Sequence, residues 1–180
     1  QSALRDDQRR FATTPAEVIA LQRAAQRSGR RHLNAGVAIH SLRAASVASI
    51  RELGRLAENL DGAIHIHVAE QTAEVDDCLA ATGARPIEWL LREGLLDARW
   101  QLVHATHALP AEIEGVAASG AGIVICPTTE ANLGDGLTDL PHWLAWGVPI
   151  AIGSDSQVTR GWAEELRWLD YGQRLLLRAR

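Results

Sequence analysis

The 180-residue sequence predicts an α/β protein built on a parallel sheet, and three observations point to this fold class. Short β-rich runs alternate with segments of helical periodicity. The runs recur at intervals of roughly 20 to 40 residues, which is the size of a βα unit. They are almost continuously apolar, as is typical of a parallel sheet covered on both faces. Five such units fit either an open doubly wound sheet or part of a (β/α)₈ barrel, and the pattern alone does not choose.

The expected strands come first in each unit. They lie at residues 35–40, 63–69, 100–107, 122–126 and 148–153. After the first strand, apolar residues recur three and four positions apart between residues 47 and 60, which predicts one helix face. A longer helical region is expected from 72 to 96, interrupted by Gly83 and Pro86.

Two further helices and one loop complete the predicted fold. Pro110 opens a short helix that ends before Gly120. An amphipathic helix is expected from 162 to 178. Residues 126–136 (CPTTEANLGDG) are expected to form a tight loop over the mouth of a cavity, because glycine, asparagine and threonine suit turns. Cys126, at a strand end before proline, is expected to be packed rather than reactive.

The composition excludes several classes of protein. The chain has no lysine, so a Schiff-base lysine, a phosphate-loop lysine and a metal-bridging lysine are all ruled out within it. With a net charge of −4 and no basic cluster, nucleic-acid binding is not expected. No apolar stretch approaches the roughly 20 residues of a membrane span. The two cysteines are too few for a disulfide framework, which predicts a reducing compartment, the cytoplasm.

The chain contains no methionine and begins with a polar run. We therefore expect it to be a piece of a longer protein. The six tryptophans stand mainly in or beside the expected helices, and core packing is the expectation for all of them.

Ionisable residues gather at the carboxyl ends of the expected strands. They are His40, His67, Glu70, His104 and Asp155. In both candidate folds this edge of the sheet binds ligands. Burying so many ionisable groups is costly unless a metal or a substrate compensates, so their recurrence indicates a functional site.

The stretch HIHVAEQ, residues 65–71, leaves two interpretations open. His65 and His67 share one face of a strand and could form a paired metal site. Alternatively, only His67 binds a metal, and Glu70 is a proton carrier in the same cavity. A structural explanation for Glu70 is an acid at a helix N-terminus, favoured by the helix dipole.

Three other strand ends offer site residues. In VHATH, His104 is expected to point inward and His107 to be a loop residue, because residues three apart on a strand face opposite ways. Asp155 follows an apolar strand directly and could ligate a metal and accept a proton from water, or could simply cap a turn. Arg43, close after His40, suits a carboxylate substrate, although a lone arginine is usually a surface residue.

The order His67, Glu70, His104 and Asp155 on successive βα units resembles the amidohydrolase superfamily of metal-dependent hydrolases. The segments AIHSLRA, HIHVAEQ, LVHATH, CPTTEANLGDG and GSDSQ narrow the resemblance to the formiminoglutamate deiminases of that superfamily. The resemblance runs from Asn34 to the end of the chain. It implies that residues 1–180 are the C-terminal portion of a single (β/α)₈ barrel domain, with strands four to eight present and the N-terminal portion absent.

The resemblance also implies the cofactor and the reaction. One zinc ion would be held by His67, Asp155 and a His-x-His pair on the first barrel strand, and no segment before His40 offers that pair. The reaction would convert N-formimino-L-glutamate to N-formyl-L-glutamate and ammonia in histidine degradation. Asp155 would take a proton from water, His104 would steady the water and the tetrahedral intermediate, and Glu70 would carry protons to the nitrogen.

By the same resemblance, His40 and Arg43 would hold the glutamate part of the small-molecule substrate, and the protein would be a homodimer.

Three other interpretations of the function stay open. One is a deaminase of purine, pyrimidine or triazine rings, although Arg43 disfavours a flat neutral base. Another is an inactive binding module, suggested by the missing His-x-His pair. The last is an ordinary doubly wound enzyme, for which no glycine-rich first turn is present.

Overall fold

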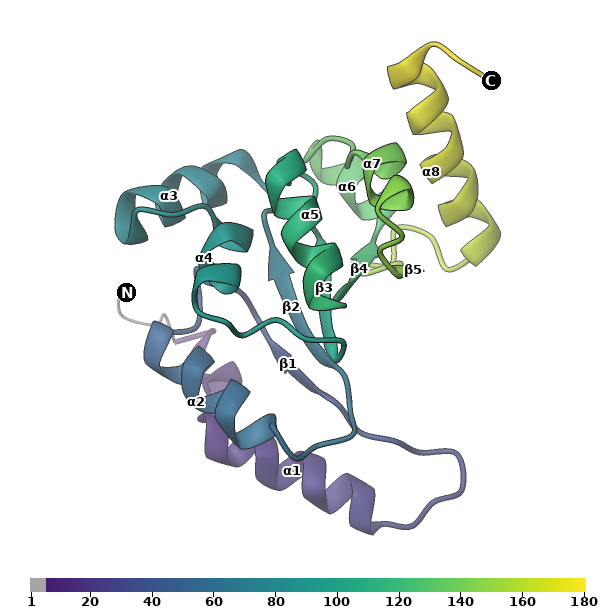
Figure 1. Ribbon diagram of the computed structural model, residues 1–180. Helices are drawn as coiled ribbons and strands as arrows, with labels where there is room; N and C mark the ends of the chain where they lie inside the picture. The colour runs from purple at the N-terminus through teal and green to yellow at the C-terminus, as the bar shows by residue number, and fades with distance from the viewer. Residues whose placement is uncertain (1–5) are drawn as a thin grey trace. The chain divides into compact units, whose positions relative to one another are not determined.

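The computed structural model describes residues 6–180, which form two compact units (Figure 1). The first unit ends at Ile66 and the second runs from His67 to Arg180. Strand β2 (Ile64–Val68) begins in the first unit and ends in the second.

The first unit begins with helices. Its elements are a 3₁₀ helix (η1, Arg9–Phe11), α1 (Pro15–Arg27), β1 (Val37–Ile39), α2 (Val47–Ala57) and the start of β2. Helix α1 is not among the helices predicted from the sequence. Its signal is a capping box, in which the Thr14 hydroxyl accepts from the Glu17 N–H at 3.3 Å and the Glu17 carboxylate accepts from the Thr14 N–H at 2.7 Å.

Strands β1 and β2 pair in parallel, with Val37 opposite Ile64 and Ile39 opposite Ile66. The backbones come very close just before this pair. A Cβ on Gly62 would lie 2.2 Å from the Ala35 carbonyl oxygen, so only glycine fits there. Helix α2 buries the apolar face that the periodicity predicts (Ile50, Leu53 and Ala57).

The second unit holds the rest of the chain. Its elements are the end of β2, α3 (Thr72–Thr82), α4 (Pro86–Arg92), β3 (Trp100–His104), α5 (Pro110–Ser119), β4 (Gly122–Ile125), α6 (Pro127–Leu133), α7 (Leu140–Ala145), β5 (Ile150–Ile152) and α8 (Trp162–Leu177). Strands β3, β4 and β5 pair in parallel, each with the next in the chain. All five expected strands are present, though they are shorter than the apolar runs.

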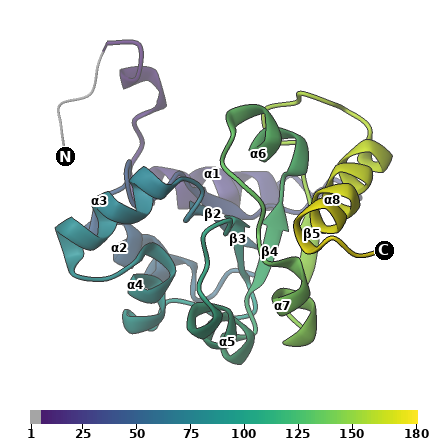
Figure 2. The same cartoon turned by 90° about the horizontal axis from the view of Figure 1, so that it is seen from above.

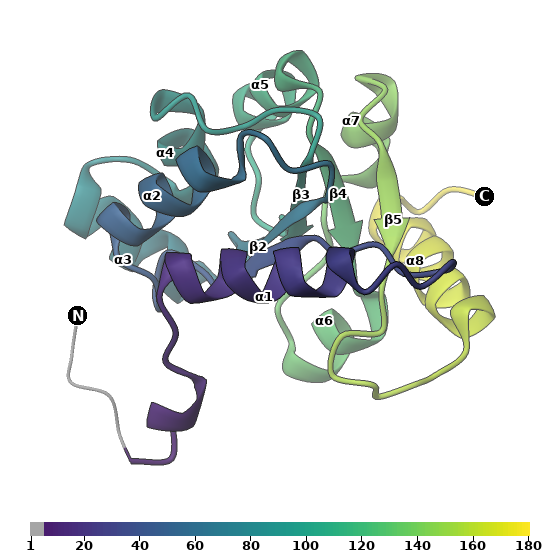
Figure 3. The same cartoon turned by 90° about the horizontal axis from the view of Figure 1, so that it is seen from below.

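Helices lie on both sides of the β3–β5 sheet. Figures 2 and 3 show α4, α5 and α7 on one side of β3, β4 and β5, and α6 on the opposite side. The strands supply fully buried apolar side chains such as Leu102, Ile123 and Ile125. Every residue of β3 and β4 is buried or half-buried, as their apolar runs predict, whereas Ala151 on β5 is exposed.

Two expectations were wrong in detail. Residues 126–136 are not a continuous loop, because Pro127 occupies the first helical turn and α6 continues to Leu133. It ends at Gly134, whose φ of +74° suits glycine. The second concerns the tryptophans. Trp89, Trp100 and Trp143 are packed in the core as expected, whereas Trp146, Trp162 and Trp168 are exposed.

No helix within residues 6–180 is long and apolar enough to cross a membrane.

Candidate metal and catalytic site

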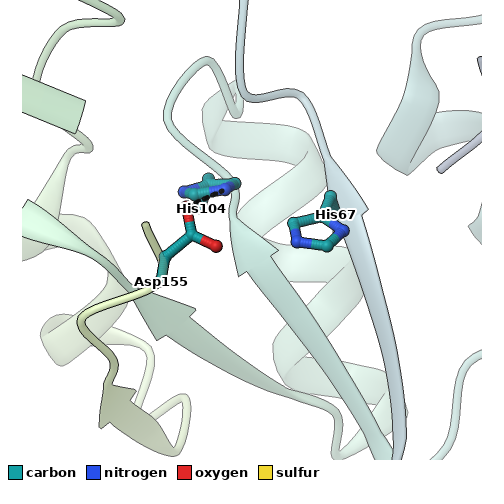
Figure 4. Close-up of side chains that lie close together, drawn as sticks. All are labelled: His67, His104 and Asp155. Carbon is teal, nitrogen blue, oxygen red and sulfur yellow. Dashed lines mark ion pairs between the residues drawn. The ribbon is translucent and has the colours of Figure 1, made fainter. Parts of the chain in front are cut away.

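Three side chains from different strand ends of the second unit converge on one point (Figure 4). His67 lies on β2, His104 is the last residue of β3, and Asp155 follows β5. One ligand atom from each lies within 4.8 Å of those of the other two. The parallel strands bring them together because their carboxyl ends meet at the same edge.

The backbone at these strand ends is strained. His104 and Asp155 have φ values of 70° and 43°, and Ala69, between His67 and Glu70, has a φ of 49°. Non-glycine residues rarely adopt this left-handed region, and each such residue costs of the order of 1–3 kcal/mol. Strain of this kind is typical of functional sites, where it aims side chains that a regular strand would direct elsewhere.

The imidazole of His104 is almost fully buried, with 1% of its surface exposed. Its Nδ1 lies 3.3 Å from Oε1 of Glu130. Its Nε2 faces Oε1 of Glu70 at 3.7 Å and Oδ2 of Asp155 at 4.0 Å. The ring also stacks against His67, with centroids 5.6 Å apart. His104 is therefore held on one side and faces the site on the other.

Carboxylates make this pocket attractive to positive charge. Burial favours the neutral form of His104, but the hydrogen bond with Glu130 and the charges of Glu70, Glu130 and Asp155 outweigh it and raise the pKa of this imidazole. The same negative field favours a cation beside the ring. Imidazole nitrogen and carboxylate oxygen are ligands that zinc accepts, so the cluster of His67, His104 and Asp155 fits a divalent metal ion.

His65 does not belong to this cluster. It is exposed on β2, and the group of residues whose ligand atoms meet contains His67 instead. Of the two interpretations of HIHVAEQ, the geometry therefore favours the one in which only His67 faces a metal.

Glu70 lies beside the cluster and is 9% exposed. Helix α3 begins only at Thr72, and the acid in its first turn is Glu74. The Glu74 carboxylate accepts a hydrogen bond from the Glu70 N–H at 2.9 Å. The role of a helix N-terminal acid thus falls to Glu74, while the Glu70 side chain faces His104.

The two expected substrate contacts lie in the first unit. His40 follows β1 directly and its Nδ1 lies 3.0 Å from the Ser41 hydroxyl. Arg43 is exposed in the turn that follows. His107, expected in a loop, lies after β3, where its N–H donates to the Ala69 carbonyl at 3.0 Å and its carbonyl accepts from the Arg85 guanidinium.

Cys126 is packed against the site, with 2% of its surface exposed. Burial, assisted by three nearby carboxylates, raises the pKa of its thiol to about 12. With its pKa raised this far, the Cys126 side chain stays a protonated thiol at neutral pH. The thiolate is the nucleophilic form, so Cys126 does not act as a nucleophile here.

Sequence reasoning missed Glu130, although it contacts His104. The signal lies in PTTE, where a proline opens a helix and an acid follows in the first turn. The Glu130 carboxylate accepts from the Cys126 N–H at 2.9 Å and so caps its own helix. The contact with His104 bridges 26 positions of sequence and could not be predicted from spacing.

Residues 8–179 match the model of the amidohydrolase family. The chain is 51% identical to formimidoylglutamate deiminase of Pseudomonas aeruginosa over 145 residues, which are 81% of this chain and 32% of that enzyme. Among solved structures, an amidohydrolase from Brucella melitensis superposes with a TM-score of 0.92 at 44% identity, over 99% of this chain and 40% of that one.

An adenosine deaminase from Xanthomonas campestris, solved with bound zinc, superposes with a TM-score of 0.83 at 27% identity. The match covers 91% of this chain and 38% of that one. The chain therefore spans about a third of the length of its curated relative and about two fifths of the structures. The predicted fold class, a parallel α/β fold of the metal-dependent hydrolase type, is confirmed.

Proposed function

Since the chain belongs to the amidohydrolase family, we propose that it is the C-terminal portion of a barrel enzyme that hydrolyses N-formimino-L-glutamate. The products are N-formyl-L-glutamate and ammonia, and the reaction belongs to histidine degradation. The observation that carries the hydrolytic chemistry is the convergence of His67, His104 and Asp155 within 4.8 Å. The choice of substrate rests on the 51% identity to formimidoylglutamate deiminase.

A single zinc ion is the proposed cofactor. His67 and Asp155 would hold it from this chain, with further ligands from a His-x-His pair on the first strand of the barrel. When bound, zinc lowers the pKa of water toward neutrality and so supplies a nucleophile at physiological pH. The His67 imidazole and the Asp155 carboxylate are donors that zinc accepts, which supports this choice of metal.

The residues of this chain divide the proton transfers between them. Water adds to the formimino carbon, and the Asp155 carboxylate accepts the first proton that water loses. His104 offers its Nε2 side to the reacting oxygen and steadies the tetrahedral intermediate. Glu70, 3.7 Å from Nε2 of His104, carries to the terminal nitrogen the two protons that water gives up. The bond from carbon to that nitrogen breaks as the C=O bond forms, so ammonia leaves and the amide nitrogen is retained.

His40 and Arg43 are the proposed contacts of the glutamate part of the substrate. A guanidinium matches a carboxylate with two parallel hydrogen bonds, which favours a linear amino-acid derivative over a neutral ring. We further propose that the enzyme is a homodimer in the cytoplasm and acts on a small molecule alone, without nucleic acid or membrane partners.

The test is a comparison of substrates. The full-length protein, loaded with zinc, is assayed for ammonia release from N-formimino-L-glutamate and from adenosine. We expect kcat/KM for N-formimino-L-glutamate to exceed that for adenosine by at least about 10²-fold. Adenosine has no carboxylate to bind the guanidinium that the proposal assigns to the glutamate part of the substrate. Preference for adenosine would identify a ring deaminase instead, the function that the similarity to the adenosine deaminase supports.

A further inference from the structure

Helix α6 touches the site through two consecutive side chains. Glu130, which is 2% exposed, lies between the Cys126 N–H at 2.9 Å and Nδ1 of His104 at 3.3 Å. An ionised carboxylate can only accept hydrogen bonds. Nδ1 of His104 therefore donates to this carboxylate, and Nε2 is the nitrogen turned toward Glu70 and Asp155.

The neighbouring residue, Thr129, holds the loop that carries Asp155. Its hydroxyl donates to the Ser154 carbonyl at 3.1 Å and accepts from the Ser156 N–H at 3.2 Å. The Ser156 hydroxyl lies 2.9 Å away as well. One fully buried hydroxyl thus contacts the backbone on both sides of Asp155, the residue whose φ is 43°.

Helix α6 is itself fixed from its other side. The Glu165 carboxylate, on α8, accepts from the Thr128 N–H at 3.0 Å and from the Thr128 hydroxyl at 2.6 Å. The side chains of Thr128 and Glu165 are both buried. Thr128 contacts α8, whereas Thr129 and Glu130 contact residues of the site. Substitutions on this one helix can therefore remove either the packing contact or a contact with the site.

We propose that Thr129 and Glu130 are positioning residues for the hydrolytic reaction. Glu130 sets the tautomer and orientation of His104, and Thr129 keeps Asp155 in its strained backbone conformation. The role of Asp155 and His104 rests on the proposed function. Partners that orient a metal ligand or a catalytic imidazole in this way typically contribute 10- to 100-fold to metal affinity or activity.

The first test compares variants of the zinc-loaded full-length protein. Thr129→Val and Glu130→Gln should each lower kcat by about 10- to 100-fold with KM changed by less than about threefold, and Thr129→Ser should restore most of the loss. The control is Thr128→Val, which removes the buried hydrogen bond with Glu165 on the same helix. It should lower the Tm and leave kcat near the wild-type value.

The second test does not depend on any substrate. Nitrogen-15 NMR of the His104 ring is recorded on the metal-free full-length protein on the basic side of the ring's own titration, where the imidazole is neutral. We expect the Nδ1–H tautomer in the wild type and a shift toward Nε2–H in Glu130→Ala. An unchanged tautomer in Glu130→Ala, wild-type kcat in Thr129→Val, or an equal loss of kcat in Thr128→Val would each overturn the proposal. If the wild type released no ammonia but the tautomer shifted as expected, the proposed function would fail and the positioning of His104 would stand.

Discussion

Glutamine in place of Glu70 is expected to lower kcat of the zinc-loaded full-length protein by about 10²- to 10⁴-fold, the usual contribution of a positioned proton carrier. The Glu70 carboxylate is nearly buried and faces Nε2 of His104 at 3.7 Å. Glutamine keeps the volume and can still accept a hydrogen bond, but it cannot pass a proton to the leaving nitrogen. The measurement is steady-state ammonia release, with zinc content checked for each sample.

The matched control is Glu114→Gln, which makes the same change at an exposed position of α5. Its kcat should equal that of the wild type. If Glu70→Gln and Glu70→Ala both released ammonia at rates near the wild type, Glu70 would have no part in proton transfer.

Replacement of His67 by asparagine is the other change with a large expected effect. His67 supplies one of the three ligand atoms that meet within 4.8 Å, so its loss should weaken zinc binding by more than about 10²-fold and abolish ammonia release at limiting zinc. Zinc retained after equilibration with a competing chelator measures the affinity directly.

His65 provides the control for His67 on the same strand. It is exposed and stands outside the cluster, so His65→Asn should keep both zinc and activity. If His65→Asn lost zinc as severely as His67→Asn, the paired-histidine interpretation of HIHVAEQ would hold instead.

Much of the site could be predicted from the sequence because the chain alternates strands and helices. A βα repeat places every strand end at one edge of the sheet, so His67, His104 and Asp155 could be assigned to a common edge from their order alone. The comparisons confirm the fold class that carries this argument.

Residues that act through long-range contacts could not be predicted in this way. The segment 126–136 is rich in residues that favour turns, yet Pro127 and the capping carboxylate of Glu130 make its first part helical. The contacts of Glu130 with His104 and of Thr129 with Ser154 depend on the packing of α6 against neighbouring strand ends, which no local periodicity encodes.

Exposed tryptophans show a second limit of sequence patterns. Trp162 and Trp168 lie on the amphipathic helix α8, and hydrophobicity alone assigned them to the core. In the structure they are 75% and 50% exposed. Hydropathy gives the tendency of a side chain to be buried, but the surface available to bury it depends on the tertiary fold.

Anomalous X-ray diffraction at the zinc edge, from crystals of the zinc-loaded full-length protein, locates the metal without reference to activity. We expect a single peak at about 2.0–2.2 Å from a His67 nitrogen and an Asp155 oxygen, with the His104 ring lining the same pocket. A peak bound elsewhere, with the side chains of residues 67, 104 and 155 turned toward separate surroundings, would contradict the assignment of this strand edge as the hydrolytic centre.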